Sequence, residues 1–219
     1  VAWTHGMTLE LRSVTLRLSG AAAPLVADLS LRVGAGEVLT LMGPSGIGKS
    51  TLLDFVGGHL DPAIEASGRV ILDGRDVTAL PAEARRIGIL FQDAMLFPHL
   101  SVGDNLAFGL APSLRGREAR AAAVEAALAQ AGLAGFAQRD PATLSGGQRA
   151  RAALMRALLA EPHALLLDEP FSRLDAGLRG EIRSFTFAHL KARAIPALLV
   201  THDQGDADAA GGAVVTLGA

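Results

Sequence analysis

The stretch from Gly43 to Thr51 constrains the fold of this chain more than any other part of its sequence. It reads Gly-Pro-Ser-Gly-Ile-Gly-Lys-Ser-Thr and matches the pattern G-x-x-x-x-G-K-[ST]. The short apolar run 38–42 precedes it, and an apolar stretch of helical character begins after it at Leu52. A strand, a glycine-rich loop and a helix in this order make up a phosphate-binding loop. We therefore expect an α/β protein with this loop at the end of a buried strand.

Each part of this loop has an expected role toward a nucleoside triphosphate. The backbone N–H groups at the glycines wrap the phosphates, and the helix N-terminus adds positive potential. Lys49 reaches the β- and γ-phosphate oxygens, and Ser50 is a ligand for Mg²⁺. The residues expected to bind the nucleotide here are Gly43, Pro44, Ser45, Gly46, Gly48, Lys49, Ser50 and Thr51.

A second apolar run, 165–167, ends in the carboxylates of Asp168 and Glu169. Acidic residues often end strands and cap helices, so the pair alone is weak evidence of a site. In a chain that also contains a phosphate-binding loop, the pair is stronger evidence of a catalytic site. We expect Asp168 to hold Mg²⁺ through water and Glu169 to polarise the attacking water.

The stretch Leu144-Ser145-Gly146-Gly147-Gln148 allows two interpretations. Ser145 and Gln148 fit a capping box, which would simply start the helix that follows. A cap alone gains nothing from two glycines in the first turn, where each costs about 1 kcal/mol relative to Ala. Glycines there expose the backbone N–H groups of a helix N-terminus, which binds anions. Both interpretations can hold at once.

Composition excludes several classes of protein. The chain has 219 residues, no Cys and a net charge of −2, so disulfide frameworks, thiolate metal sites and a dedicated nucleic-acid binder are all disfavoured. The first residues lack a basic segment followed by an apolar run, so we expect no signal peptide. No run reaches the ~18 apolar residues that suggest a membrane span. The mean hydropathy of +0.34 suggests that some apolar surface meets a partner.

The apolar pattern predicts one α/β domain over residues 1–219. Residues 1–93 and 161–219 form the core with an antiparallel β subdomain, and 94–160 form a helical subdomain. Within the latter, 117–131 and 146–159 have the character of helices. Strands are expected at 9–18, 29–33, 38–42, 69–72, 87–91, 165–167, 197–200 and 213–217.

In combination, these motifs resemble the ATP-binding cassette ATPases over nearly the whole chain. Residues 144–148 are similar to the family's signature motif, and Gln92 to its Q-loop glutamine. Ser172-Arg173-Leu174-Asp175 resembles the D-loop, and His202 the switch histidine. Taken alone, Gln92, Asp175 and His202 could be ordinary loop or cap residues, but their order along the chain matches the family.

The resemblance implies a P-loop NTPase core with an antiparallel β subdomain and a helical insertion that carries the signature. It implies Glu169, His202 and Gln92 as catalytic residues, ATP and Mg²⁺ as cofactors, and Ser50, Gln92 and Asp168 as metal ligands. In the family, two cassettes pack head to tail, so a second copy of the chain completes each site. The residues that would then contact the partner's nucleotide are Ser145, Gly146, Gly147, Gln148 and Asp175.

Residues 97–102 and Asn105 resemble bacterial import ATPases, and 142–151 and 169–175 resemble cassettes described as thiamine-type importers. This implies an integral membrane permease, a periplasmic solute-binding protein, no nucleic-acid partner, and a peripheral place on the cytoplasmic face of the inner membrane. A soluble cassette ATPase, an exporter subunit and a non-hydrolysing assembly module are the alternatives. Soluble cassette ATPases usually have a long coiled coil or a second cassette, and exporter cassettes are usually fused to membrane spans; this sequence has none of these. The intact Glu169 and His202 disfavour a non-hydrolysing module.

Two features depart from the family. Cassettes usually stack the adenine on an early aromatic residue, whereas the matching position here is Leu18 and the chain has no Tyr. Weak selectivity for the base is therefore expected. Many import cassettes also continue into a regulatory domain beyond the switch histidine. The sequence ends soon after His202, so we expect no such domain.

Overall fold

The structure is a computed structural model that describes residues 7–218. It divides into two compact units. Unit 1 takes in the described residues up to Ile89, with His163–Glu169 and the residues from Phe187 onward, and unit 2 consists of Leu90–Pro162 and Pro170–Thr186. The helical insertion expected at 94–160 falls within unit 2, which also includes the segment after Glu169.

Unit 1 contains an antiparallel sheet of order β2-β1-β4-β5. Strand β1 (Leu9–Leu18) pairs with β2 (Val26–Val33) and with β4 (Ile64–Leu72), and β5 (Arg75–Asp76) extends β4 across the turn at Asp73 and Gly74. The register of β1 shifts between Leu11 and Val14. Such a bulge moves the inward face from the odd to the even positions. Leu9, Leu11, Val14 and Leu16 are therefore all buried.

A second sheet has the order β6-β7-β8-β3-β9. Strands β7 (Ala164–Asp168), β8 (Ala197–Val200) and β3 (Val38–Met42) pair in parallel, and β3 also pairs with β9 (Val214–Thr216). Strand β6 (Ile87–Leu90) is at the other edge. Because parallel strands are covered on both faces, β7 and β8 are almost wholly apolar, as the sequence predicts.

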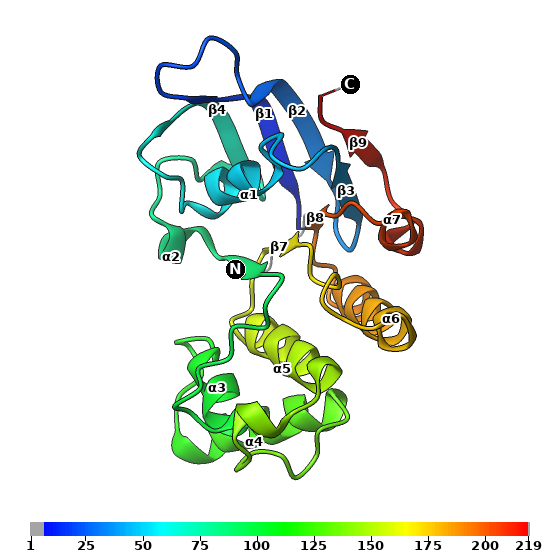
Figure 1. Ribbon diagram of the computed structural model, residues 1–219. Helices are drawn as coiled ribbons and strands as arrows, with labels where there is room; N and C mark the ends of the chain where they lie inside the picture. The colour runs from blue at the N-terminus through cyan, green and yellow to red at the C-terminus, as the bar shows by residue number, and fades with distance from the viewer. Residues whose placement is uncertain (1–6, 219) are drawn as a thin grey trace. The chain divides into compact units, whose positions relative to one another are not determined.

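Unit 1 also contains short helices (Figure 1). Helix α1 (Lys49–Gly57) follows the glycine loop, α2 (Ala82–Arg85) precedes β6, and α7 (Gln204–Ala210) follows β8. Leu52, Leu53 and Val56 of α1 join side chains of both sheets in one buried cluster. This packing fixes the helix whose first turn belongs to the phosphate-binding loop.

Unit 2 is helical. It contains α3 (Val102–Phe108), α4 (Arg117–Gln130), the 3₁₀ turn Pro141–Thr143, α5 (Gly146–Leu159) and the start of α6 (Ala176–Ala192). Val124, Leu128 and Ala131 are buried, which confirms the apolar face predicted for 117–131. No helix in residues 7–218 is long and apolar enough to cross a membrane.

Candidate nucleotide-binding site

The phosphate-binding loop lies between β3 and α1, as predicted. Gly48 is the N-cap of α1 with a φ of 103°, and a Cβ atom there would lie 3.0 Å from the Cβ atom of Leu25. Gly43, with a φ of 148°, would place a Cβ atom 2.8 Å from the carbonyl oxygen of Leu217. Both positions therefore require glycine for backbone conformation and for space.

Lys49 is buried, with 7% of its surface exposed. Its Nζ donates hydrogen bonds of 2.8 Å to the carbonyl oxygens of Gly43 and Pro44. The ammonium group is thereby held inside the curve of the loop, at the N-terminus of α1. A cation and a helix N-terminus at one point favour a bound phosphate.

Ser50 and Asp168 meet although they are far apart in sequence. The Ser50 hydroxyl donates to Asp168 Oδ1 over 3.2 Å. Burial, followed by the charges of Glu169 and Asp54, raises the pKa of Asp168 above its ordinary value, against the opposing Ser50 bond and Lys49 charge. A carboxylate destabilised in this way gains from a nearby divalent cation.

These oxygen atoms fit the chemistry of Mg²⁺, which prefers hard oxygen ligands and keeps several waters or phosphate oxygens. In residues 7–218, no three His, Cys, Asp or Glu side chains cluster into a metal site. Mg²⁺ at Ser50 and Asp168 would therefore take the rest of its ligands from the nucleotide and from water.

Glu169 and His202 follow the adjacent strands β7 and β8. His202 Nδ1 lies 3.2 Å from Glu169 Oε1. Glu169 has a φ of 46°, and its N–H donates to the carbonyl oxygen of Val200 over 2.9 Å. This conformation turns the Glu169 side chain away from the strand path and toward His202.

A polar network supports the loop that carries His202. The buried Thr201 hydroxyl donates to Asp206 Oδ2 over 2.8 Å, and the N–H of Asp203 donates to Thr201 Oγ1 over 3.1 Å. Asp203 in turn caps α7. Asp206 is 2% exposed and is a site-supporting residue that the sequence analysis missed. Its only sequence signal is its place three residues after an aspartate that begins a helix.

In unit 2, Ser145–Gln148 forms a complete capping box at the start of α5. The Gln148 N–H donates to Ser145 Oγ, and the Ser145 N–H donates to Gln148 Oε1. The capping interpretation is therefore confirmed. Packing also favours glycine at position 147, because a Cβ atom there would lie 2.5 Å from Leu178 Cδ2. At position 146, the atom nearest to an added Cβ would be 3.6 Å away.

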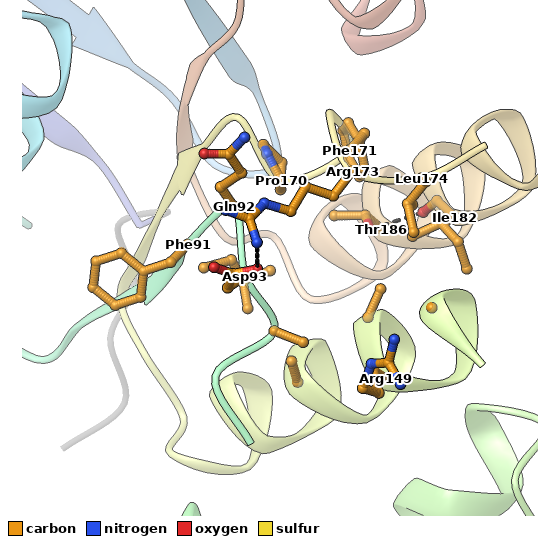
Figure 2. Close-up of a pocket in the computed structure, with 15 residues that line it drawn as sticks. Phe91, Gln92, Asp93, Arg149, Pro170, Phe171, Arg173, Leu174, Ile182 and Thr186 are labelled. Carbon is orange, nitrogen blue, oxygen red and sulfur yellow. Dashed lines mark hydrogen bonds and ion pairs between the residues drawn. The ribbon is translucent and has the colours of Figure 1, made fainter. Parts of the chain in front are cut away.

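Gln92 lines a cavity of about 260 Å³ within unit 2 (Figure 2). Gly146 and Arg149 of α5 also line it, and Asp93 forms an ion pair with Arg173 at its wall. Asp175, two residues further, accepts a hydrogen bond of 3.0 Å from the Leu178 N–H, as a helix cap does. Unit 2 thus holds Gln92, the signature stretch and Asp175, while unit 1 holds Lys49, Ser50, Asp168, Glu169 and His202.

The position expected to meet the base is Leu18, at the end of β1. It pairs with Ile64 of β4, and 48% of its surface is exposed. An exposed aliphatic side chain offers apolar contact without the π-face on which a base stacks.

Comparison with known proteins identifies the family. The model of the ABC transporter family matches residues 26–172. The chain is 50% identical over 201 residues to the uncharacterized ABC transporter ATP-binding protein YnjD of Escherichia coli K12, across 92% of this chain and 91% of YnjD. It is 46% identical over 193 residues to the Fe(3+) ions import ATP-binding protein FbpC 1 of Rhizobium meliloti, across 88% of this chain and 54% of FbpC 1.

Two further relatives extend the comparison. The spermidine/putrescine import ATP-binding protein PotA of Frankia alni is 46% identical over 189 residues, which are 86% of this chain and 40% of PotA. The chain thus spans nearly all of YnjD but only about half of FbpC 1 and less of PotA. The ATP-binding cassette MJ0796, solved as a post-hydrolysis dimer bound to ADP and Pi, has a TM-score of 0.78 and 29% identity over 95% of this chain and 94% of its own.

The fold is therefore that of an ABC ATPase, with an antiparallel sheet, a parallel sheet that carries the phosphate-binding loop, and a helical part that carries the signature. By its family match and these relatives, the chain belongs to the ABC transporter family as an ATP-binding protein.

Proposed function

We propose that this chain hydrolyses ATP to energise the import of a solute through a partner membrane permease. One observation carries the proposal. Unit 1 pairs Ser50 with Asp168 beside the phosphate-binding loop, and Glu169 with His202 at the ends of the two neighbouring strands. The names of FbpC 1 and PotA, both import ATP-binding proteins, support the direction of transport.

The proposed roles follow from the geometry of unit 1. Lys49 and the loop N–H groups bind the phosphates, and Ser50 and Asp168 hold Mg²⁺. When bound, Mg²⁺ neutralises charge on the phosphate oxygens. Glu169 accepts a proton from the attacking water. His202, whose Nδ1 lies 3.2 Å from Glu169 Oε1, keeps that carboxylate oriented.

We propose a head-to-tail dimer of two chains, each acting as one ABC ATPase domain over residues 1–219. In this arrangement Ser145, Gly146, Gly147 and Gln148 of one chain approach the nucleotide held by the other. MJ0796, itself a dimer with ADP and Pi, supports this assembly. Gln92 and Asp175 would take their Q-loop and D-loop roles in the same assembly.

The permease contact is proposed at an apolar surface of unit 2. Met95 and Phe108 are 59% and 70% exposed. The Phe108 ring packs edge-on against Phe97, and Arg156 donates to the carbonyl oxygen of Met95, so this surface is held in shape. Exposed large apolar side chains fit an apolar helix of a permease loop.

We further propose that the chain works on the cytoplasmic face of a bacterial inner membrane, with a periplasmic binding protein supplying the solute. The solute prediction, thiamine-type, rests on resemblance alone. FbpC 1 and PotA are named for different solutes, which is reasonable for a subunit that need not touch the solute.

Cross-linking tests the proposed partner. The chain has no Cys, so Met95→Cys or Phe108→Cys introduces a single thiol. Val214→Cys, in unit 1 and 46% exposed at another apolar residue, is the matched control. In membranes that contain a candidate permease with a thiol in its cytoplasmic loop, we expect a cross-link from the first two variants and not from the control. Equal cross-linking from all three, or none, would contradict the proposed contact.

A further inference from the structure

Arg85, the last residue of α2, is almost completely buried in unit 1. Only 6% of its surface is exposed, and burial lowers the pKa of its guanidinium. A buried arginine without partners is costly, so its contacts indicate what it does.

Within residues 7–218, every hydrogen-bond acceptor of the Arg85 side chain is a backbone carbonyl oxygen. Nη1 donates to Phe55 over 2.7 Å and to Val56 over 2.9 Å. Nη2 donates to Thr78 over 2.6 Å, and Nε donates to Leu80 over 2.8 Å. The planar fork of a guanidinium suits several fixed acceptors, which a lysine ammonium cannot reach together.

Phe55 and Val56 lie in the last turn of α1. The final carbonyl groups of a helix lack partners within it, and its C-terminus carries partial negative charge. Helix α1 has no basic residue of its own in this turn. Arg85 supplies that charge from α2. Gly58, the C-cap, leaves room for it, since a Cβ atom at residue 58 would lie 2.8 Å from Arg85 Nε.

The other end of α1 is the phosphate-binding loop, with Lys49 and Ser50 in its first turn. Helix α1 has only nine residues, so its C-terminal anchor, together with the core packing of Leu52, Leu53 and Val56, sets where its first turn lies. We infer that Arg85 is a positioning residue for the nucleotide site, holding the phosphate-binding loop in place through the far end of α1. This inference rests on nucleotide binding by the loop.

The test compares Arg85→Met and Arg85→Lys with the neighbouring Arg86→Met, which changes an exposed arginine. Nucleotide Kd, KM for Mg·ATP and kcat are measured on the full chain. We expect Kd and KM to rise about tenfold in Arg85→Met, with kcat largely retained, and Arg85→Lys to fall between. Arg86→Met should match the wild type.

A purely structural role gives a different result. It lowers kcat in proportion to the folded fraction, measured by circular dichroism, and leaves Kd and KM unchanged, which would overturn the inference. If Arg85→Met does not fold, Arg85→Lys decides by the same criterion. If the wild-type chain itself binds no nucleotide, the proposed function fails and the inference that rests on it is overturned as well; a wild type that binds, with unchanged Kd in Arg85→Met, overturns the inference alone.

Discussion

His202 Nδ1 lies 3.2 Å from Glu169 Oε1, across the ends of two neighbouring parallel strands. Asp168 pairs with Val200 in the sheet, so Glu169 and His202 leave β7 and β8 at nearly the same level. The hydrogen bond between Thr201 and Asp206 holds the loop that carries His202. The contact therefore results from strand register, and it brings a carboxylate and an imidazole together beside the phosphate-binding loop.

We expect His202→Ala to slow ATP turnover by about 10²-fold, because Glu169 loses the group that orients it. Nucleotide affinity should be retained, since the loop around Lys49 is untouched. His99→Ala, which removes an imidazole from unit 2, serves as the control. A wild-type steady-state rate in His202→Ala would show that the contact does not serve hydrolysis.

Asp168→Asn should raise the melting temperature of the nucleotide-free protein at neutral pH. Burial and the charges of Glu169 and Asp54 raise the pKa of Asp168 in the folded state, so ionised Asp168 lowers stability. That cost fades as the pH falls through the raised pKa. The gain from Asn should therefore shrink toward about pH 4, as the native carboxyl takes up its proton.

Asp76→Asn provides a control of opposite sign. Hydrogen bonds from Thr78 lower the pKa of Asp76, so its ionised form stabilises the fold above its unfolded pKa and this contribution is lost as the pH falls. This variant should melt at a lower temperature at neutral pH. The melting temperatures are measured by thermal scans at several pH values. A change of the same sign in the melting temperature of both variants would contradict these electrostatic effects.

Gly147→Ala should destabilise unit 2, whereas Gly146→Ala should be tolerated. The new methyl group at residue 147 would overlap Leu178 Cδ2 at 2.5 Å, while at residue 146 its nearest neighbour would be 3.6 Å away. Overpacking of this kind costs about 1–3 kcal/mol. Urea unfolding of both variants measures the difference, and equal midpoints would show that Leu178 moves aside freely.

The signature is therefore tested better through Gly146 than through Gly147. Gly146→Asp places a carboxylate at the partly buried start of α5, where it should repel the partner's nucleotide. Mixed with Lys49→Ala, it should recover one complete site per heterodimer and therefore ATPase activity that neither variant has alone. The double variant Lys49→Ala/Gly146→Asp, mixed with either single variant, should restore no ATPase activity. Absence of recovery in the mixture would argue against sites shared between chains.

ATP and GTP should bind within about tenfold of each other. Stacking on an aromatic residue is worth ~1–3 kcal/mol, and Leu18 offers only apolar contact. Leu18→Tyr should tighten the binding of both nucleotides, because any base can stack on the added ring. Competition binding measures both effects, and a strong ATP preference in the wild type would mean that another group recognises the edge of the adenine.

Features coded by neighbouring residues were predicted from the sequence. The strand at 38–42, the glycine loop and helix 146–159 all depend on contiguous patterns, and the structure has them at those positions. Features that depend on partners far away in the sequence were not predicted. Arg85 donates to the carbonyl oxygen of Phe55, 30 residues earlier, and because every residue has a carbonyl group the sequence does not indicate which one is the acceptor. Leu178 likewise gives Gly147 a packing reason that no local pattern contains.

The exposure of one side chain also needed the structure. Leu16 and Leu18 stand two residues apart in β1, yet Leu16 is fully buried and Leu18 is about half exposed. Leu18 is the last residue of its strand and lies beyond the reach of the core. Capping by Ser145 and Gln148, in contrast, was predicted, because all of its parts lie within one turn.

We propose that Glu169 supplies the base for ATP hydrolysis at a site built by Lys49, Ser50 and Asp168. Steady-state phosphate release from Mg·ATP is compared between the wild type and Glu169→Gln, with nucleotide binding measured in parallel. We expect turnover to fall by at least ~10²–10⁴-fold, with ATP binding retained and the ATP-bound dimer trapped. Hydrolysis by Glu169→Gln at the wild-type rate would contradict this proposal.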